Sequence, residues 1–151
     1  MPPIFIVDTT VLLNVLDVPG RNRDRDVVLD RLGELVDDGA SLLLPMGAIF
    51  ETGNHIARLP DGQQRRDCAE VLRDQVRQAL DGQAPWAPLQ FPDARQLAEW
   101  LEGFPDYAMQ EISMVDLSII KAWQRTCVQH PARRVAIWTL DQHLIGYDRI
   151  P

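Results

Sequence analysis

Four acidic residues at widely separated positions could act together as one site: Asp8, Glu51, Asp116 and Asp141. Carboxylates held a few ångströms apart at low dielectric repel one another strongly unless a proton or a cation joins them. Hard divalent cations such as Mg²⁺ and Mn²⁺ prefer oxygen ligands of this kind, and no cysteine competes for them here. Because these cations activate water and neutralise phosphate, the four acids favour metal-assisted phosphodiester hydrolysis.

The elements expected around these acids determine whether they can meet. Short apolar runs of strand-forming residues occupy positions 4–7, 41–44 and 135–138, and segments with helical periodicity separate them. This alternation predicts βαβ units, a parallel sheet covered by helices on both faces, and therefore an α/β fold. Ligands of open parallel sheets bind at the carboxyl ends of the strands. Asp8 and Asp141 follow two of these runs and are expected there.

The remaining elements are predicted from periodicity and from proline and glycine. Helices are expected over residues 9–16, from near Val28 to Leu35, and over residues 46–58, 63–80, 93–101 and 117–129. Leu72, Val76 and Leu80 have the spacing of a core-facing helical stripe. The sequence Gly103-Phe104-Pro105 is expected to break the helix before it. Since proline cannot donate to a sheet ladder, any strand within residues 86–91 should be an edge strand.

Each acid also has an ordinary structural explanation. The two aspartates at strand exits can be helix N-caps, Asp116 can complete a capping box with Ser113, and Glu51 can be a solvated helix residue. Capping alone does not readily place two acids at strand exits and Asp116 on an apolar helical stripe. The combination therefore favours a shared metal site over independent structural roles.

The acids lie in motifs that resemble those of the PIN-domain nucleases. Four family motifs are matched in order by Ile6-Val7-Asp8-Thr9-Thr10-Val11-Leu12-Leu13, Glu51, Ser113-x-x-Asp116 and Thr139-Leu140-Asp141-x-x-Leu144. The resemblance spans nearly the whole chain, whose size is similar to that of the VapC-type toxin ribonucleases. It implies a three-layer α/β/α sandwich with a central, mainly parallel sheet, a Mg²⁺ or Mn²⁺ site, and endonucleolytic cleavage of RNA. It also implies a homodimer and an antitoxin partner.

The resemblance assigns roles to individual residues. Metal ligation, direct or through water, and catalysis would fall to Asp8, Glu51, Asp116 and Asp141. Supporting roles are expected for Thr10, Thr139, Ser113, Asn54 and His55. The two threonine hydroxyls would support Asp8 and Asp141. Asn54 and His55 follow Glu51 by about one helical turn, where they could bind phosphate, position water or orient Glu51.

Basic residues and net charge constrain how RNA could bind. Arg21, Arg23 and Arg25 lie in a loop expected to border the groove, where they could contact an RNA backbone or hold an antitoxin. A net charge of −7 by itself argues against a nucleic-acid partner. However, two bound divalent ions, each carrying +2, would bring the formal charge from −7 to −3. RNA affinity should then come from the metal and a few local arginines.

Length and composition limit the class of protein. A chain of 151 residues with ordinary apolar content is expected to form one domain, residues 1–151. Cys68 and Cys127 match neither a disulfide framework nor a zinc site. The sequence has no secretory leader and no apolar run approaching the ~18 residues of a membrane span, so a soluble, cytoplasmic protein without membrane association is expected.

Two other functions remain open. The segment Glu51-Thr52-Gly53-Asn54-His55 departs from the apolar continuation usual in the PIN family, so the chain could be a catalytically silent module that binds RNA or a protein. It could also be an aspartyl phosphotransfer protein with Asp8 as nucleophile. That alternative is weaker because the motif lacks a second aspartate and because the single lysine, Lys121, lies inside a predicted helix.

Overall fold

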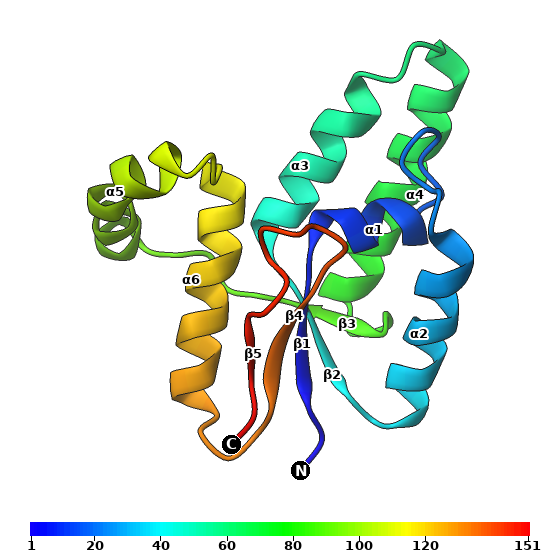
Figure 1. Cartoon of the computed structure of the whole chain (residues 1–151). Coiled ribbons are helices and arrows are strands. Elements are labelled where there is room, and N and C mark those ends of the chain that lie inside the picture. Colours follow the sequence, from blue (N-terminus) through cyan, green and yellow to red (C-terminus); the bar gives the residue numbers. More distant parts are fainter.

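A five-stranded sheet forms the centre of the computed structural model, which describes residues 1–151 (Figure 1). The strands are β1 (Ile4–Val7), β2 (Ser41–Leu44), β3 (Trp86–Pro88), β4 (Val135–Trp138) and β5 (Asp148–Arg149). Their order is β3-β2-β1-β4-β5; the first four run parallel, and β5 is antiparallel to β4. The predicted α/β class and mainly parallel sheet are confirmed, and the strand expected within residues 86–91 lies at an edge.

Helices cover both faces of the sheet, which gives the three-layer arrangement (Figure 1). They are α1 (Thr9–Val15), α2 (Arg25–Asp37), α3 (Met46–Ala57), α4 (Gly62–Leu80), α5 (Ala94–Met109) and α6 (Met114–Gln129). Helices α1 to α4 contribute to the larger apolar cluster on one face, and α6 contributes to a smaller cluster on the other. None of these helices is long and apolar enough to cross a membrane.

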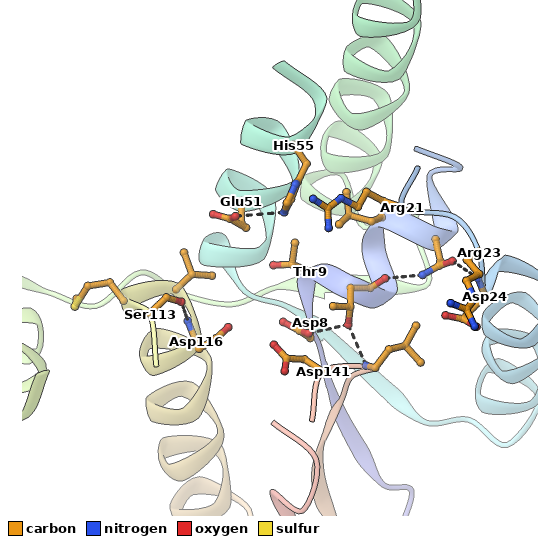
Figure 2. A pocket seen from close by; sticks show the side chains of 16 residues that line it. Asp8, Thr9, Arg21, Arg23, Asp24, Glu51, His55, Ser113, Asp116 and Asp141 are labelled. Carbon is orange, nitrogen blue, oxygen red and sulfur yellow. Dashed lines mark hydrogen bonds and ion pairs between the residues drawn. The ribbon is translucent and has the colours of Figure 1, made fainter. Parts of the chain in front are cut away.

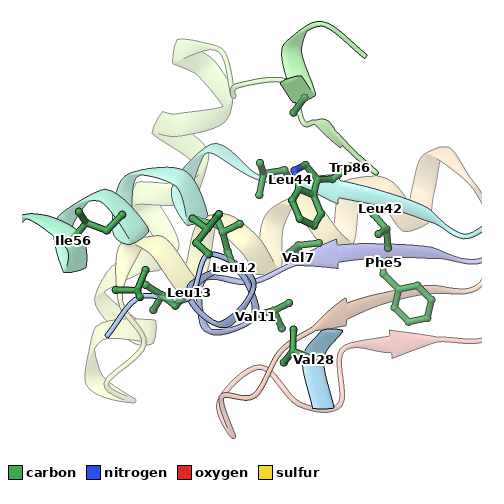
Figure 3. Close-up of a cluster of buried hydrophobic side chains, with 14 of the residues drawn as sticks. Phe5, Val7, Val11, Leu12, Leu13, Val28, Leu42, Leu44, Ile56 and Trp86 are labelled. Atoms are coloured by element: carbon green, nitrogen blue, oxygen red, sulfur yellow. The ribbon is translucent and has the colours of Figure 1, made fainter. Parts of the chain in front are cut away.

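The alternation of side chains along β1 explains why this strand is central. Phe5 and Val7 point into the larger cluster, which Figure 3 shows, whereas Ile6 packs with Ile137 in the smaller one. All four residues of β1 are buried, as expected for a strand covered on both faces. Each such side chain contributes roughly 1.5–3 kcal/mol by leaving water. The continuous apolar run therefore fixes the strand that ends at Asp8.

Strand register brings the loops that carry the acids to one edge of the sheet. Val7 is level with Trp138 of β4, and the backbone N–H of Asp8 donates to the Trp138 carbonyl at 3.0 Å. On the other side of β1, Ile6 is level with Leu43 of β2. Pro45, the residue after β2, is the N-cap of α3. The ends of β1, β2 and β4 thus open onto the same side of the molecule.

Three expectations about the elements are wrong. Helix α5 does not end before Gly103 but continues through Pro105 to Met109, because Phe104 and Tyr107 remain half-buried and Tyr107 packs on the smaller cluster. Leu80 is 68% exposed; the buried residue at the end of α4 is its neighbour Ala79. Strand β5 was not expected, since two residues are too short to show a pattern.

Candidate functional site

A pocket of about 490 Å³ opens at the carboxyl edge of the sheet, and all four candidate acids line it (Figure 2). The candidate acids come from the end of β1, from α3, from the first turn of α6 and from the turn after β4: Asp8, Glu51, Asp116 and Asp141. A fifth acid, Asp24 at the N-cap of α2, lines the side of the pocket that carries the basic loop. We call it the four-acid pocket. Residues separated by more than 130 positions are brought together because β1 and β4 are neighbours in the sheet.

Asp8 is the deepest of the four, with only 2% of its surface exposed. It occupies the N-cap position of α1, but its side chain makes no capping hydrogen bond. Its Oδ2 instead accepts hydrogen bonds from the hydroxyls of Thr10 at 2.8 Å and Thr139 at 2.7 Å. Oδ1 receives no hydrogen bond from the protein, so one oxygen of a fixed carboxylate is left for a ligand.

The two threonines also hold the turn that carries Asp141. The Thr139 hydroxyl accepts from the Asp141 N–H at 2.9 Å, and the Thr10 hydroxyl accepts from the Leu140 N–H at 3.0 Å. Oδ1 of Asp141 caps its own turn by accepting from the His143 N–H at 2.9 Å. The structure therefore places both supporting threonines beside the acids for which they were predicted, and Asp141 has a structural role as well.

Asp116 lies half-buried in the first turn of α6. The Ser113 hydroxyl accepts from the Asp116 backbone N–H at 3.1 Å, whereas the Asp116 carboxylate does not complete a capping box. Burial raises the pKa of this carboxyl to about 6, with further contributions from the negative charges of Asp8 and Asp141. The charged form of Asp116 is thus disfavoured first by burial and then by the other acids of the pocket.

Glu51 faces the pocket from α3 and contacts His55 one turn further along the helix. The distance between His55 Nε2 and Glu51 Oε1 is 3.3 Å. Burial lowers the pKa of His55, and the nearby positive charge of Arg21 lowers it further, whereas Glu51 raises it. The lowered pKa disfavours the charged imidazole, and the two side chains lie in contact on one face of α3.

The predicted basic loop contributes two of its three arginines. Arg21 and Arg23 line the pocket and make no ion pair with the protein. Arg25 is turned away: its guanidinium donates to the carbonyls of Asn14 at 3.5 Å and Val15 at 3.2 Å. The prediction for Arg25 is therefore wrong in its placement, because the side chain ties the loop to α1 instead of facing a ligand.

Two further placements differ from the prediction. Asn54 is exposed and does not line the pocket, since one residue of displacement turns a helical side chain by about 100° from His55. Lys121 does not line the pocket either; its ammonium lies 5.9 Å from the centre of the Tyr107 ring. The aspartyl phosphotransfer alternative thus lacks a lysine beside Asp8.

Sequence reasoning missed Thr9 and Asn14, which both line the pocket. Thr9 is 6% exposed, and its hydroxyl has no hydrogen-bond partner in the protein. Asn14 bonds to the Thr10 carbonyl and to the Asp24 N–H at 2.8 and 3.0 Å. A helical projection places Asn14 four residues after Thr10 on the same face, so that signal was available.

The chemistry of the pocket fits a hard divalent cation. Its donors are carboxylate and hydroxyl oxygens, and neighbouring carboxylates raise the pKa of Asp116. No three acidic, histidine or cysteine side chains converge closely enough to enclose an ion by themselves. This spacing suits Mg²⁺, which keeps several waters and usually binds through one or two carboxylates. The residues present could therefore hold such an ion partly through water.

Comparison with known proteins supports the fold. Neither a family model nor a curated protein matches the sequence. The crystal structure of FitAcB from Neisseria gonorrhoeae is similar, with a TM-score of 0.54 and 20% sequence identity over 95% of this chain and 91% of that one. With its three layers and its β3-β2-β1-β4-β5 sheet, this chain has a PIN-like fold, as its motifs predicted.

Proposed function

We propose that this protein is a divalent-metal-dependent endoribonuclease that hydrolyses RNA phosphodiester bonds in the four-acid pocket. The observation that carries the proposal is the meeting of four acids from separate elements in one pocket, where burial and, to a lesser extent, the charges of the neighbouring acids raise the pKa of Asp116. Such a site is costly without a cation and becomes favourable with one. The PIN-like fold supports the same activity, and the four acids lie in motifs that resemble those of the PIN-domain nucleases.

The roles of the residues follow from their placement. Asp8 and Asp116 would hold Mg²⁺ or Mn²⁺, with Glu51 and Asp141 acting directly or through water. When bound, the cation supplies an activated water and neutralises charge on the phosphate. Thr10 and Thr139 keep Asp8 in one orientation, His55 does the same for Glu51, and the carboxylates accept the proton that water releases.

The test is cleavage of an end-labelled RNA with Mg²⁺ or Mn²⁺, compared with the same reaction in a chelator. Asp8→Asn and Asp116→Asn should each lose at least ~100-fold in rate, because each removes an anionic ligand or base from the reacting centre. Asp106→Asn is the matched control: it removes one exposed acid from α5, which does not line the pocket. Full, chelator-sensitive activity in either pocket variant would refute the proposal.

A binding module without nuclease activity is the second candidate. Such a module would need no metal, and no three of the acids approach closely enough to enclose an ion without water. Calorimetric titration with Mn²⁺ separates the two functions. A nuclease should show a metal site that disappears in Asp8→Asn, whereas a silent module should show none.

The toxin of a toxin–antitoxin pair is the biological role that we propose for this nuclease, acting in the cytoplasm as a homodimer. The proposal rests on the resemblance of the motifs to those of the PIN-domain nucleases, on a chain length similar to that of the VapC-type toxins, and on the PIN-like fold. A small protein encoded directly upstream, which copurifies with this chain and suppresses its activity, would support the role. An isolated reading frame with no inhibitory partner would indicate a solitary nuclease.

A further inference from the structure

We propose that Arg21 and Thr9 form an anion subsite in the four-acid pocket, which binds a phosphate of the RNA strand next to the phosphate that is cut. This inference rests on the proposed nuclease function and adds a second contact along the strand. The subsite lies toward Glu51 and His55, at the part of the pocket bordered by the basic loop (Figure 2).

The Thr9 hydroxyl is the first observation that indicates a ligand. It is buried, lines the pocket and has no partner in the protein. A buried hydroxyl without a partner is unfavourable, because it has lost its hydrogen bonds to water. Thr10, the next residue, satisfies its hydroxyl with Asp8 and Leu140, so of these two pocket threonines only Thr9 lacks a partner. A phosphate oxygen would supply the missing acceptor.

The Arg21 guanidinium is the second observation. It lines the pocket, lies near His55 and makes neither a hydrogen bond nor an ion pair, although five acids line the same pocket (Figure 2). Glu51, which shares that part of the pocket, is in contact with His55 at 3.3 Å and makes no ion pair with Arg21. The planar guanidinium remains free to bind two oxygens of one phosphate.

The loop that carries Arg21 is anchored, so little ordering is needed when a ligand binds. The Asn14 side chain accepts from the Asp24 N–H at 3.0 Å, and Arg25 bonds to the carbonyls that end α1. Within the loop the Arg21 N–H donates to the Val18 carbonyl at 3.0 Å. A fixed backbone lowers the entropy cost of placing the arginine against a ligand.

The two parts of the pocket therefore differ in charge, because Arg21 offsets the negative charge of Glu51 in one part, whereas three aspartates share the other. Asp8, Asp116 and Asp141 repel a phosphate unless a cation lies between them. Arg21 and Thr9 offer only donors to an anion and require no cation. An RNA strand that crosses the pocket would place one phosphate over the acids and the next on the arginine. These two contacts define the line along which the RNA lies.

The experiment compares substrates with and without a neighbouring phosphate. Wild type, Arg21→Ala and Thr9→Val are assayed on a twelve-nucleotide single-stranded RNA and on bis(4-nitrophenyl) phosphate, a single diester. For the RNA, each variant should raise KM about 10-fold with little change in kcat, because ground-state binding is lost. For the single diester, kcat/KM should stay within about twofold of wild type. Thr9→Ser should restore the wild-type KM.

Binding provides a readout that does not require turnover. In an Asp116→Asn background, the slope of log K against log salt for the same RNA should fall by about 0.7 in Arg21→Ala, the loss of one phosphate contact. Arg77→Ala is the matched control, since Arg77 is an exposed arginine of α4 outside the pocket. It should change neither the slope nor KM.

The outcomes separate this inference from the proposed function. Equal losses on both substrates, or an unchanged KM and salt slope in Arg21→Ala, would overturn the subsite. If wild type cleaves neither substrate with any divalent metal, the nuclease proposal fails, and the salt slope alone decides whether the subsite exists.

Discussion

The Thr139 hydroxyl donates a 2.7 Å hydrogen bond to Asp8 Oδ2, which ties the turn after β4 to the end of β1. The same hydroxyl accepts from the Asp141 N–H, so one side chain fixes two of the four acids. Because the bond uses Oδ2, it leaves Oδ1 as the oxygen of Asp8 that is free for a ligand. Removing a group that only orients a metal ligand commonly lowers metal affinity about 10–100-fold.

Replacing Thr139 tests this arrangement. Thr139→Val keeps the shape but removes the hydroxyl, and we expect Mn²⁺ affinity to fall about 10–100-fold by calorimetry. Thr139→Ser, which retains the hydroxyl, should bind within a few-fold of wild type. Equal Mn²⁺ affinity in the valine variant and wild type would mean that Thr10 alone holds Asp8.

Asp116 should make the stability of the metal-free protein depend on pH. Its folded pKa, about 6, lies above the usual value of 3.8. The folded state therefore binds this proton more tightly than the unfolded state does. The charged Asp116 carboxyl destabilises the fold to its full extent above pH 6, and this destabilisation is absent below pH 3.8. Asp116→Asn should raise the free energy of unfolding at pH 7.5 by about 1 kcal/mol after allowing for solvent exposure, which corresponds to a rise in Tm of about 2–4 °C.

The gain from Asp116→Asn should shrink as the pH falls toward 4.5 and the wild-type carboxyl takes up its proton. Differential scanning calorimetry in chelator measures both values. The exposed-acid variant Asp106→Asn should show no such pH dependence. A gain that is the same at both pH values would assign the stabilisation to something other than the charge of Asp116.

Gly47 controls the approach of α3, which carries Glu51, to α6, which carries Asp116. A Cβ at Gly47 would lie 2.7 Å from Ser118 Oγ, which is held by a 2.6 Å bond to the Val115 carbonyl. Gly47→Ala should destabilise the fold by about 1–3 kcal/mol through overpacking and should lower the cleavage rate. Urea unfolding and the RNA assay measure the two effects.

Two variants isolate the steric cause. Adding Ser118→Ala to Gly47→Ala should recover most of the lost stability, because it removes the clashing oxygen. Gly33→Ala, in α2 with open space around the new methyl, should instead stabilise by about 0.4–1 kcal/mol. If Gly47→Ala is as stable as wild type, the Ser118 hydroxyl moves aside without cost.

Asn14 should affect substrate binding without affecting metal binding. Asn14→Ala removes the acceptor for the Asp24 N–H and loosens the loop that carries Arg21 and Arg23. We expect a KM for RNA raised several-fold, with Mn²⁺ affinity within about twofold of wild type, because Asn14 makes no bond to the four acids. A comparable loss in metal affinity would place Asn14 in the metal site instead.

The positions of the acids could be predicted because each acid follows a short sequence pattern that indicates a strand or a helix. The parallel sheet then brings the ends of these elements to one edge. The apolar run before Asp8 indicates a buried strand, and strand exits of a parallel sheet lie at one edge. Asp116 was found in the same way, from helical periodicity and a capping serine. None of these inferences required knowledge of a side-chain conformation.

The missed features depend on packing between distant segments. Thr9 and Thr10 have the same side chain, but the Thr10 hydroxyl bonds to Asp8 and lies 3.5 Å from the hydroxyl of the distant Thr139, whereas the Thr9 hydroxyl has no partner. Strand β5 is held by paired hydrogen bonds from Arg134 to Asp148 at 2.9 and 2.7 Å, a contact across the sheet that no short window reveals. Tertiary contacts likewise override the proline in α5.

The central place of β1 has a consequence for synthesis of the chain. The strand that leads to Asp8 is synthesised before Thr139, which lies 131 positions further along the chain. Until β4 pairs with β1, Asp8 lacks one of its two hydroxyl donors and the pocket lacks Asp141. A nascent chain therefore cannot complete the proposed site until β4 has been made and has paired with β1.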